Sequence, residues 1–332
     1  MTMTQPLATV FGGSGFVGRY IVQALAHSGW RVRVAVRRPN EAMFTMTYGT
    51  TGQVQPVQAN IRDEASTRAA LMGADLVVNC VGILFPDGKQ KFDAVQTEGA
   101  ARIARLAAAE GVSRMVHISA IGADINSGSD YAVSKAEGEA AVLEHMPDAY
   151  ILRPSIVFGP EDGFFNRFGN MAARLPVVPV VGGDTRFQPV YVDDVADAAV
   201  ACAEGRATPG VYELGGPDIE TFRTLMERIK RVTLRPRRVL MGVPFWLAGL
   251  QGRMLDLLPT LTFGVVPNSI LTRDQVRLLR HDNVVGEDAI GFADLGIVPR
   301  DMDGILESYL WRFRPNGQYA EMLGSAKNLR HE

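Results

Sequence analysis

The sequence predicts an α/β fold, with a Rossmann-type, doubly wound parallel sheet and a smaller, mostly C-terminal, α-rich domain. Two observations predict this class. Short apolar runs alternate with helical patterns through the first half of the chain, and three glycines, Gly12, Gly15 and Gly18, follow the first apolar run. Strands that alternate with helices form βαβ units, and the sheets built from them bind ligands outside the carboxyl ends of their strands.

The expected elements follow one another in βαβ order. Strands are predicted over residues 7–12, 30–39, 54–61, 75–82, 114–122 and 149–159. Helices are predicted over residues 17–29, 93–111 and 131–146, and again over 221–232. Residues 187–205 are predicted to form a short strand and a helix. We therefore predict a nucleotide-binding domain over 5–165, with a return of the chain near 187–216, and a smaller docking domain over 166–186 and 217–332.

The composition is that of a soluble globular protein. The chain has 332 residues, of which 47% are hydrophobic and 21% charged, and its formal net charge is -2. This charge gives no strong attraction to nucleic acid, so we expect no nucleic-acid partner. The two cysteines and five histidines lack the spacing of metal ligands, so we expect no metal. We also expect no signal peptide and no transmembrane helix, because neither a leader pattern nor 18 consecutive apolar residues occurs.

The stretch TVFGGSGFVGRY, residues 9–20, has the pattern of a dinucleotide-binding loop. Gly12 permits a tight turn, Gly15 lets the backbone approach a pyrophosphate, and Gly18 allows the helix to pack closely on the strand. The N–H groups that open the helix then face the anion. Glycines at this spacing also occur in packed turns, but their place in the first βαβ unit favours dinucleotide binding. Ser14 and Phe16 belong to the same loop and complete the contacts expected there.

The end of the second strand indicates which dinucleotide is bound. An acidic residue at this place would bind the ribose 2′-hydroxyl of NAD, whereas the segment here is VAVRRPN. The guanidinium groups of Arg37 and Arg38 are suited to the oxygens of a 2′-phosphate. A solvated basic edge is the alternative interpretation. We favour NADP(H), and NADPH in particular.

Several segments resemble the extended and atypical short-chain dehydrogenases/reductases, the superfamily of the sugar-nucleotide epimerases and dehydratases. The resemblance rests on FGGSGFVG, ANIRD (59–63), VVNCVG (77–82), YAVSK (131–135) and ILRPSIVFGPED (151–162), which occur in this order. For the first half of the cofactor, it implies that Asn60 and Ile61 contact the adenine and that Val81 and Gly82 lie along the dinucleotide.

The resemblance also implies a nicotinamide end built from Tyr131, Lys135 and Pro154. In this superfamily a tyrosine acts as acid and base, with an ordinary pKa of about 10. A lysine one helical turn later lowers that pKa by its charge and binds the nicotinamide ribose. The family's third group is a serine or threonine hydroxyl that polarises the substrate carbonyl. Ala120 stands at that position, directly after Ser119, so the resemblance implies a vestigial catalytic pair unless the register slips by one residue and Ser119 supplies the hydroxyl.

A narrower resemblance extends into the C-terminal half. It rests on ATVFGGSGFVGRYIVQAL (8–25), ILRPSIVFGPEDGFFNRF (151–168), FQPVYVDDVADA (187–198) and LTRDQVRLLRHDNVV (271–285). These segments resemble the NADPH-binding accessory subunits of respiratory complex I and their bacterial relatives. The resemblance implies a tightly held NADPH, partners in the peripheral arm of complex I near the membrane, and a peripheral place on the cytoplasmic face of a bacterial inner membrane.

The region 222–259 is first basic and then apolar. Seven basic residues and one acid lie between Phe222 and Leu240, and Phe245, Trp246, Leu247 and Leu250 follow. This pattern suits a surface that contacts a membrane or a partner. It equally suits a helix buried in its own core and flanked by a solvated basic face, and the residues alone leave both interpretations open.

Three functional hypotheses remain at this point. The first is a complex I accessory subunit in which NADPH is structural and catalysis is weak or absent. The second is an active NADP-dependent reductase, epimerase or dehydratase that uses Tyr131 and Lys135. The third is a redox-sensing regulator that binds NADPH and a protein partner.

Overall fold

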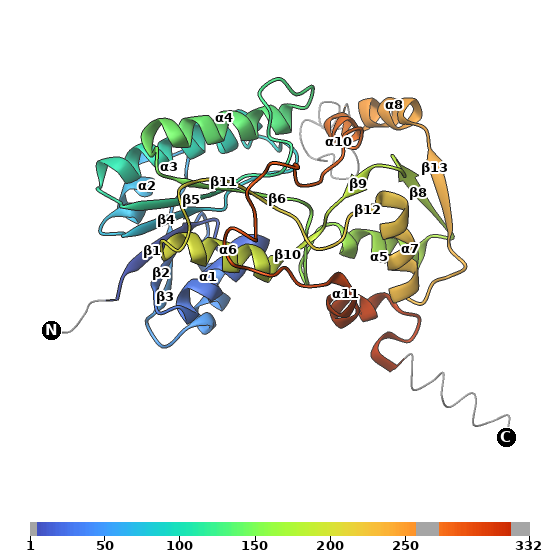
Figure 1. Cartoon of the computed structure of the whole chain (residues 1–332), viewed down its shortest axis with the longest axis horizontal. Coiled ribbons are helices and arrows are strands. Elements are labelled where there is room, and N and C mark those ends of the chain that lie inside the picture. Colours follow the sequence, from blue (N-terminus) through green and yellow to red (C-terminus); the bar gives the residue numbers. More distant parts are fainter. Residues whose placement is uncertain (1–4, 257–271, 320–332) are drawn as a thin grey trace.

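A computed structural model describes residues 5–256 and 272–319 of the chain. A seven-stranded parallel sheet forms its larger part, with strand order β11-β6-β5-β4-β1-β2-β3 (Figure 1). The strands are β1 (Leu7–Phe11), β2 (Arg31–Val36), β3 (Val54–Gln58), β4 (Leu76–Asn79), β5 (Arg114–Ile118), β6 (Tyr150–Pro154) and β11 (Gly210–Leu214). The order reverses at β1, where β2 and β4 are its two neighbours. The predicted doubly wound fold is therefore confirmed.

Helices cover both faces of the sheet (Figure 1). One face carries α2 (Glu64–Leu71), α3 (Glu98–Ala109) and α4 (Asp130–His145), and the other carries α1 (Phe16–His27) and α6 (Val192–Ala203). Each face has its own apolar core, because alternate residues of a strand point to opposite faces. Val10 and Val34 pack with α1 and α6, whereas Phe11 and Ala35 pack with α3. Both layers of core thus hold the carboxyl ends of the strands in register.

Several elements differ from the sequence-based expectation. The helix expected over 93–111 opens with a π-helical turn, Asp93–Thr97. The strand expected over 149–159 is two strands, since β6 ends at Pro154 and β7 (Val157–Phe158) pairs with β10 (Val190–Tyr191) outside the large sheet. Proline has no N–H to donate, which limits pairing where the first strand ends. A 3-10 segment, Pro39–Tyr48, follows β2 where no element was expected.

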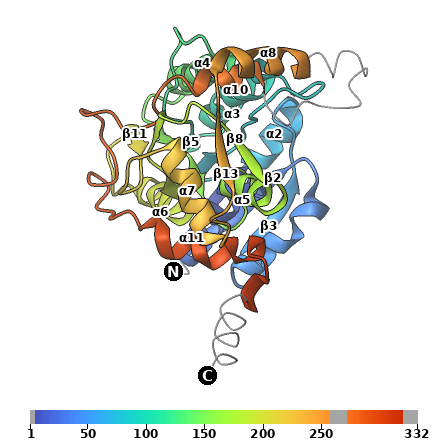
Figure 2. The same ribbon diagram turned by 90° about the vertical axis from the view of Figure 1, so that its right-hand side faces the viewer.

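The smaller part of the molecule faces the viewer in Figure 2, and its described residues combine helices with two short strand pairs, β9 with β12 and β8 with β13. Its helices are α5 (Phe165–Arg174), α7 (Phe222–Val232), α8 (Phe245–Asp256), α10 (Arg273–Leu278) and α11 (Met302–Leu310), and two 3-10 turns follow at Trp311–Phe313 and Gly317–Tyr319. Its strands are β8 (Val177–Val181), β9 (Arg186–Phe187), β12 (Glu220–Thr221) and β13 (Val239–Val243). A core that includes Phe165, Phe222 and Leu306 holds these elements together.

Part of the C-terminal region packs back on the large sheet. Phe292 and Leu295 belong to the core beneath α1 and α6, and the amide of Glu213 in β11 donates to the carbonyl of Ile290. Residues near 290 thus contact the sheet although the sequence assigns them to the smaller domain. The domain boundaries stay a prediction.

Some expectations fall outside the described residues. These are positions 257–271 and 320–332 of the smaller domain, which include positions 257–259 of the region 222–259 and position 271 of the motif 271–285. Within the ranges that are described, no helix combines the length and hydropathy needed to cross a bilayer.

Candidate dinucleotide site

The glycine loop joins β1 to α1 at the edge of the sheet where ligands bind in this fold. Gly12 has a φ of +74°, in the left-handed region that favours glycine, and a Cβ there would lie 3.2 Å from the carbonyl carbon of Cys80. Gly18 is more restricted still, because its Cβ would lie 2.3 Å from the oxygen of Gly12. The first turn of α1 therefore lies directly on the loop, as an anion site of this type requires.

The N-terminus of α1 offers its amides to a ligand. Gly15 is the N-cap residue and no side chain caps the helix, nor does its first turn contain an acidic residue. These N–H groups carry the positive end of the helix dipole. The loop thus fits the pyrophosphate of a dinucleotide, with Ser14 and Phe16 at the entrance of the helix.

The two arginines that follow β2 are exposed. Arg38 forms an exposed ion pair with Glu41 at 3.0 Å, and Arg37 has no hydrogen-bond partner within the described part of the chain. An exposed ion pair of this kind contributes little free energy, so a phosphate could readily replace Glu41 as the partner of Arg38. The arrangement leaves both guanidinium groups accessible at the strand end.

Asn60 and Ile61 follow β3, on the side of the sheet where the adenine is expected. The Asn60 side-chain oxygen accepts from the amide of Arg62 at 3.2 Å, and the Asn60 amide donates to Ser66 Oγ at 3.1 Å. Ile61 is buried against Gly99, where a Cβ would lie 2.6 Å from Ile61 Cδ1. The turn is thus rigid, although the adenine contact itself stays a prediction.

Val81 and Gly82 follow β4 and line the approach to Lys135. Asn79 holds this segment, since its side-chain oxygen accepts from the amide of Val81 at 3.1 Å while its side-chain nitrogen contacts His117 Nδ1 at 3.1 Å. Burial lowers the pKa of His117 to about 3, so the imidazole is neutral. A Cβ on Gly82 would lie 3.3 Å from Lys135 Nζ, so the glycine leaves space directly beside this buried amine.

Tyr131 and Lys135 lie one turn apart on α4, as predicted from their spacing. Lys135 Nζ lies 6.0 Å from the centroid of the Tyr131 ring and donates to the carbonyl oxygen of Ile118 at 3.2 Å. Burial lowers the pKa of Lys135 to about 8, and burial also raises the pKa of Tyr131 to about 12. Desolvation is the cause of the raised tyrosine pKa, which is opposite in direction to the lowering expected from the lysine charge.

Ser119 and Ala120 directly follow β5. Ser119 is buried, and its hydroxyl has no hydrogen-bond partner. Ala120 is only partly buried, so the methyl group, and not the hydroxyl, is the more accessible of the two side chains. The carbonyl of Pro154, at the end of β6, accepts from the amide of Ile121 at 3.0 Å and fixes the position of this loop.

Gln96 was not predicted as a site residue. It lies in the π-helical turn, its Nε2 donates to Ser134 Oγ at 2.8 Å, and its buried Oε1 has no partner. That oxygen lies 3.6 Å from where a Cβ of Gly82 would be, on the same side as Lys135 Nζ. A buried glutamine in an otherwise amphipathic helix pattern is the only signal that the sequence offers for it.

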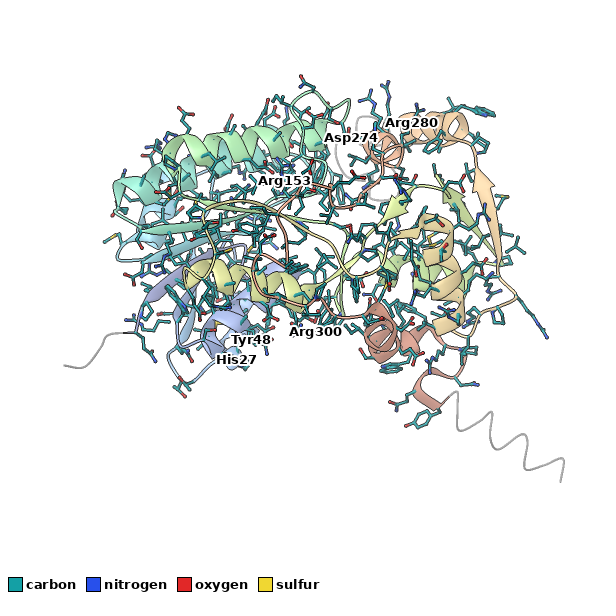
Figure 3. The ribbon with its side chains drawn as sticks, viewed as in Figure 1. His27, Tyr48, Arg153, Asp274, Arg280 and Arg300 are labelled. Atoms are coloured by element: carbon teal, nitrogen blue, oxygen red, sulfur yellow. The ribbon has the colours of Figure 1, made fainter. Side chains whose placement is uncertain are left out.

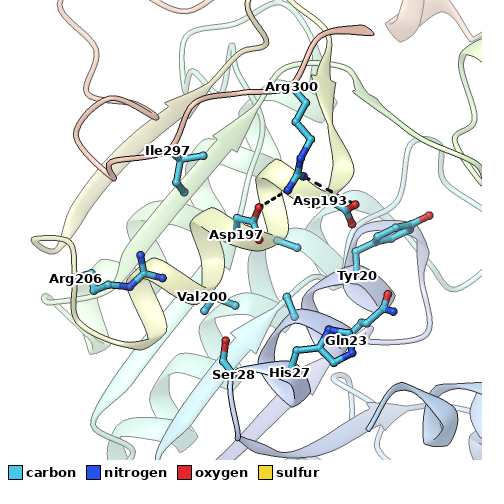
Figure 4. A pocket seen from close by; sticks show the side chains of 12 residues that line it. Tyr20, Gln23, His27, Ser28, Asp193, Asp197, Val200, Arg206, Ile297 and Arg300 are labelled. Carbon is cyan, nitrogen blue, oxygen red and sulfur yellow. Dashed lines mark hydrogen bonds and ion pairs between the residues drawn. The ribbon is translucent and has the colours of Figure 1, made fainter. Parts of the chain in front are cut away.

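A separate pocket of about 560 Å³ lies between α1, α6 and the segment near Arg300 (Figure 4). None of the residues predicted to bind the cofactor lines it. Arg300 crosses its edge, with ion pairs to Asp194 at 2.9 Å and Asp197 at 3.1 Å. No group of three or more potential metal ligands occurs within the described ranges.

The phosphate loop, the strand order and the Tyr131–Lys135 helix agree with a family match over most of the first two thirds of the chain. Residues 8–215 match the NAD dependent epimerase/dehydratase family. The chain belongs to this family. The roles that the family implies for individual residues of this chain stay predictions, because the match covers the domain and tests no single contact.

Relatives extend the similarity to nearly the whole chain. The mitochondrial NADH dehydrogenase [ubiquinone] 1 alpha subcomplex subunit 9 of Arabidopsis thaliana is 34% identical, over 94% of this chain and 79% of that protein. The mouse subunit of the same name is 32% identical, over 90% of this chain and 78% of that protein. The chain is thus a homologue of these complex I subunits. A ceramide reductase of Caulobacter vibrioides is 33% identical, over 60% of this chain and 62% of that protein.

Solved structures agree on the fold. The crystal structure of gox2253 has a TM-score of 0.70 and 21% identity, over 95% of this chain and 99% of that one. An NADPH-dependent quinone oxidoreductase of Escherichia coli, in complex with NADPH, has a TM-score of 0.69 and 18% identity, over 90% and 97%. At this identity the likeness concerns the fold alone, which is that of a nicotinamide-dinucleotide-binding domain.

Proposed function

We propose that the chain is an NADPH-binding accessory subunit of a bacterial respiratory complex I, in which the nucleotide is a structural ligand and catalysis is weak or absent. The observation that carries this proposal is the similarity to complex I subunits over 94% of the chain. This similarity includes the C-terminal part of the chain. A similarity limited to the dinucleotide domain would end before that part. Its partners would be subunits of the peripheral arm near the membrane, on the cytoplasmic face of the inner membrane.

The structural role of the nucleotide is supported by the contrast between two parts of the site. The glycine loop and the lysine expected to hold a dinucleotide are both present, whereas Ala120 offers no hydroxyl to a substrate carbonyl. When the free nucleotide concentration is about a thousand times its dissociation constant, binding stabilises the folded state by roughly 4 kcal/mol through mass action. A nucleotide that stays bound without reacting would therefore stabilise the fold, and this site needs no catalytic activity for that role.

The choice of NADPH is supported by the exposed guanidinium groups of Arg37 and Arg38. It is tested by measuring the affinities of the Arg37→Ala/Arg38→Ala variant for NADPH and NADH. We expect about a tenfold to hundredfold loss for NADPH and little change for NADH, because only NADPH carries the 2′-phosphate. Equal losses for both nucleotides would refute the cofactor assignment.

A second candidate function is an active NADP-dependent reductase, epimerase or dehydratase. It is favoured by the position of Lys135 Nζ, 6.0 Å from the centroid of the Tyr131 ring, and by the unpartnered Ser119 hydroxyl, one residue before Ala120. The ceramide reductase relative is consistent with such an activity. The test is hydride transfer from NADPH to a carbonyl substrate. If the wild type shows this activity and Tyr131→Phe lacks it, this candidate is favoured over the first.

We also propose that α8 contributes a contact with the membrane surface. Its exposed apolar side chains support this, with Trp246 71%, Leu247 42% and Leu250 51% exposed. A basic group lies beside this helix, since the Arg280 guanidinium lies 5.3 Å from the centroid of the Phe245 ring at the start of α8. Interfacial aromatic and aliphatic side chains beside basic ones are typical of a peripheral membrane contact.

A further inference from the structure

Residues 272–286, called here the C-terminal clasp, contact three segments at the carboxyl edge of the large sheet. The clasp contains α10, which begins with a capping box between Thr272 and Gln275. It lies more than 100 residues later in the sequence than the segments that it contacts near Tyr131, Ile121 and Ser155. None of the expected cofactor contacts belongs to the clasp, so its role in the site must come from the residues it holds.

Asp274 holds the first turn of α4. Its carboxylate accepts from Ser129 Oγ at 2.8 Å, from the amide of Asp130 at 2.9 Å and from the amide of Tyr131 at 3.2 Å. Figure 3 labels Asp274 where α10 meets the start of α4. Amides in the first turn of a helix have no partner within the helix, and a carboxylate also interacts favourably with the helix dipole. One side chain of the clasp therefore fixes the backbone that carries the tyrosine.

Asn283 holds the two loops on the other side of the same edge. Ser155 Oγ, just after Pro154, donates to Asn283 Oδ1 at 2.7 Å, and Asn283 Nδ2 donates to the carbonyl of Ile121 at 3.3 Å. The backbone of Asn283 is itself held, since its amide donates to the carbonyl of Arg186 at 2.8 Å. The loop that contains Ala120 and the end of β6 are thus linked through one amide side chain.

We infer that Asp274 and Asn283 are positioning residues for the nicotinamide end of the dinucleotide site. The inference rests on the proposed binding of NADPH with its nicotinamide beside Tyr131 and Lys135. A bound group is held well only where the side chains that contact it are themselves fixed by surrounding contacts. Loss of the clasp contacts would loosen α4 and the loop after β5, while the glycine loop and the arginines after β2 would keep their geometry.

The test compares two ligands that share the adenine half of the cofactor. NADPH contains the nicotinamide, and 2′,5′-ADP lacks it. We expect Asp274→Asn to weaken NADPH binding about tenfold, since hydrogen bonds to a charged group are lost, and to change 2′,5′-ADP binding less than twofold. Asp294→Asn is the control, because Asp294 is a carboxylate of the same C-terminal region that accepts from the amide of Gly291 at 2.8 Å and contacts neither α4 nor Asn283. This control should leave the ratio of the two affinities unchanged.

Hydrogen exchange of the ligand-free protein gives a second measurement. In Asp274→Asn the amides of Asp130 and Tyr131 should exchange faster, with no change in the glycine loop. If Asp274→Asn does not fold, Asn283→Ala tests the same ratio of affinities. Equal losses for the two ligands, or no loss for either, would overturn the inference. A wild-type chain that binds 2′,5′-ADP but gains nothing from the nicotinamide half would instead refute the proposed cofactor arrangement, and with it the clasp's role.

Discussion

Gly18 and Gly304 show how one residue type has different roles in the same helical position. Each is the third residue of its helix, but a Cβ would lie 2.3 Å from the Gly12 oxygen in α1 and would meet nothing within 4 Å in α11. We expect Gly18→Ala to lower the free energy of unfolding by about 1–3 kcal/mol and to abolish nucleotide binding. Gly304→Ala should raise it by about 0.5–1 kcal/mol, because alanine favours the helix. Urea denaturation of both variants measures this, and equal effects would contradict the assigned contact.

Lys135 makes stability depend on pH in a definite direction. Burial lowers its pKa from 10.5 to about 8, so between these values the unfolded chain binds more protons than the folded chain. Stability attributable to this group therefore rises as the pH increases from 8 to 10.5. The difference in free energy of unfolding between wild type and Lys135→Met should shift in favour of wild type over that range. Urea titrations of the ligand-free proteins at several pH values measure it, and a difference that stays constant with pH would contradict the lowered pKa.

Single residues of the site differed in how well the sequence predicted them. The turn at Gly12 and the close packing at Gly18 could be predicted because their spacing reflects a local turn, whereas the Tyr131–Lys135 pair came from the family resemblance and its role stays a prediction. Gln96 could not, because its unpartnered oxygen becomes evident only when the π-helical turn packs beside Gly82. Asp274 could not for a similar reason, since its three donors lie 143 to 145 residues away in the sequence.

Helix α4 is held to the sheet by a buried ion pair between elements. Arg153 in β6 donates to Glu139 through Nε at 2.9 Å and Nη2 at 2.6 Å, and the Glu139 side chain is 6% exposed. Removal of the arginine leaves a buried carboxylate without its partner, so Arg153→Met should cost about 3–5 kcal/mol. Adding Glu139→Gln to that variant should restore part of the loss.

An exposed pair provides the control for this prediction. Arg105 in α3 donates to Glu64 in α2 at 2.8 Å, with both side chains about half exposed. Arg105→Met should change the free energy of unfolding by less than about 1 kcal/mol. Equal costs for Arg153→Met and Arg105→Met in thermal or urea denaturation would show that burial of the Arg153 pair has no special effect.

Whole elements were predicted best where the pattern is long and locally determined. The strands of the parallel sheet and helices α1, α4 and α7 followed from apolar periodicity. The boundary between β6 and β7 did not, because it depends on pairing of β7 with β10, which comes more than 30 residues later. The packing of Phe292 and Leu295 on the large sheet also depends on tertiary contact, so no local pattern could have predicted it.

The exposed face of α8 gives a prediction for the molecule as a whole. The full chain should sediment with vesicles that contain anionic lipid at low salt, and less at high salt, because the basic charge beside α8 is screened. Trp246→Ser/Leu250→Ser should reduce the bound fraction severalfold. Met43→Ser/Met46→Ser is the matched control, since these exposed apolar side chains, 51% and 42% exposed, lie in the 3-10 segment after β2. Absence of binding at low salt would refute the membrane contact.

The most direct test of the account is recovery of the full-length chain from native membranes by an affinity tag, with identification of the proteins and the nucleotide that accompany it. The account predicts that subunits of NADH:quinone oxidoreductase are recovered together with the chain, and that denaturation releases NADPH in near-stoichiometric amount. A chain found only free of those subunits, or one that releases no NADPH or NADP, would contradict it.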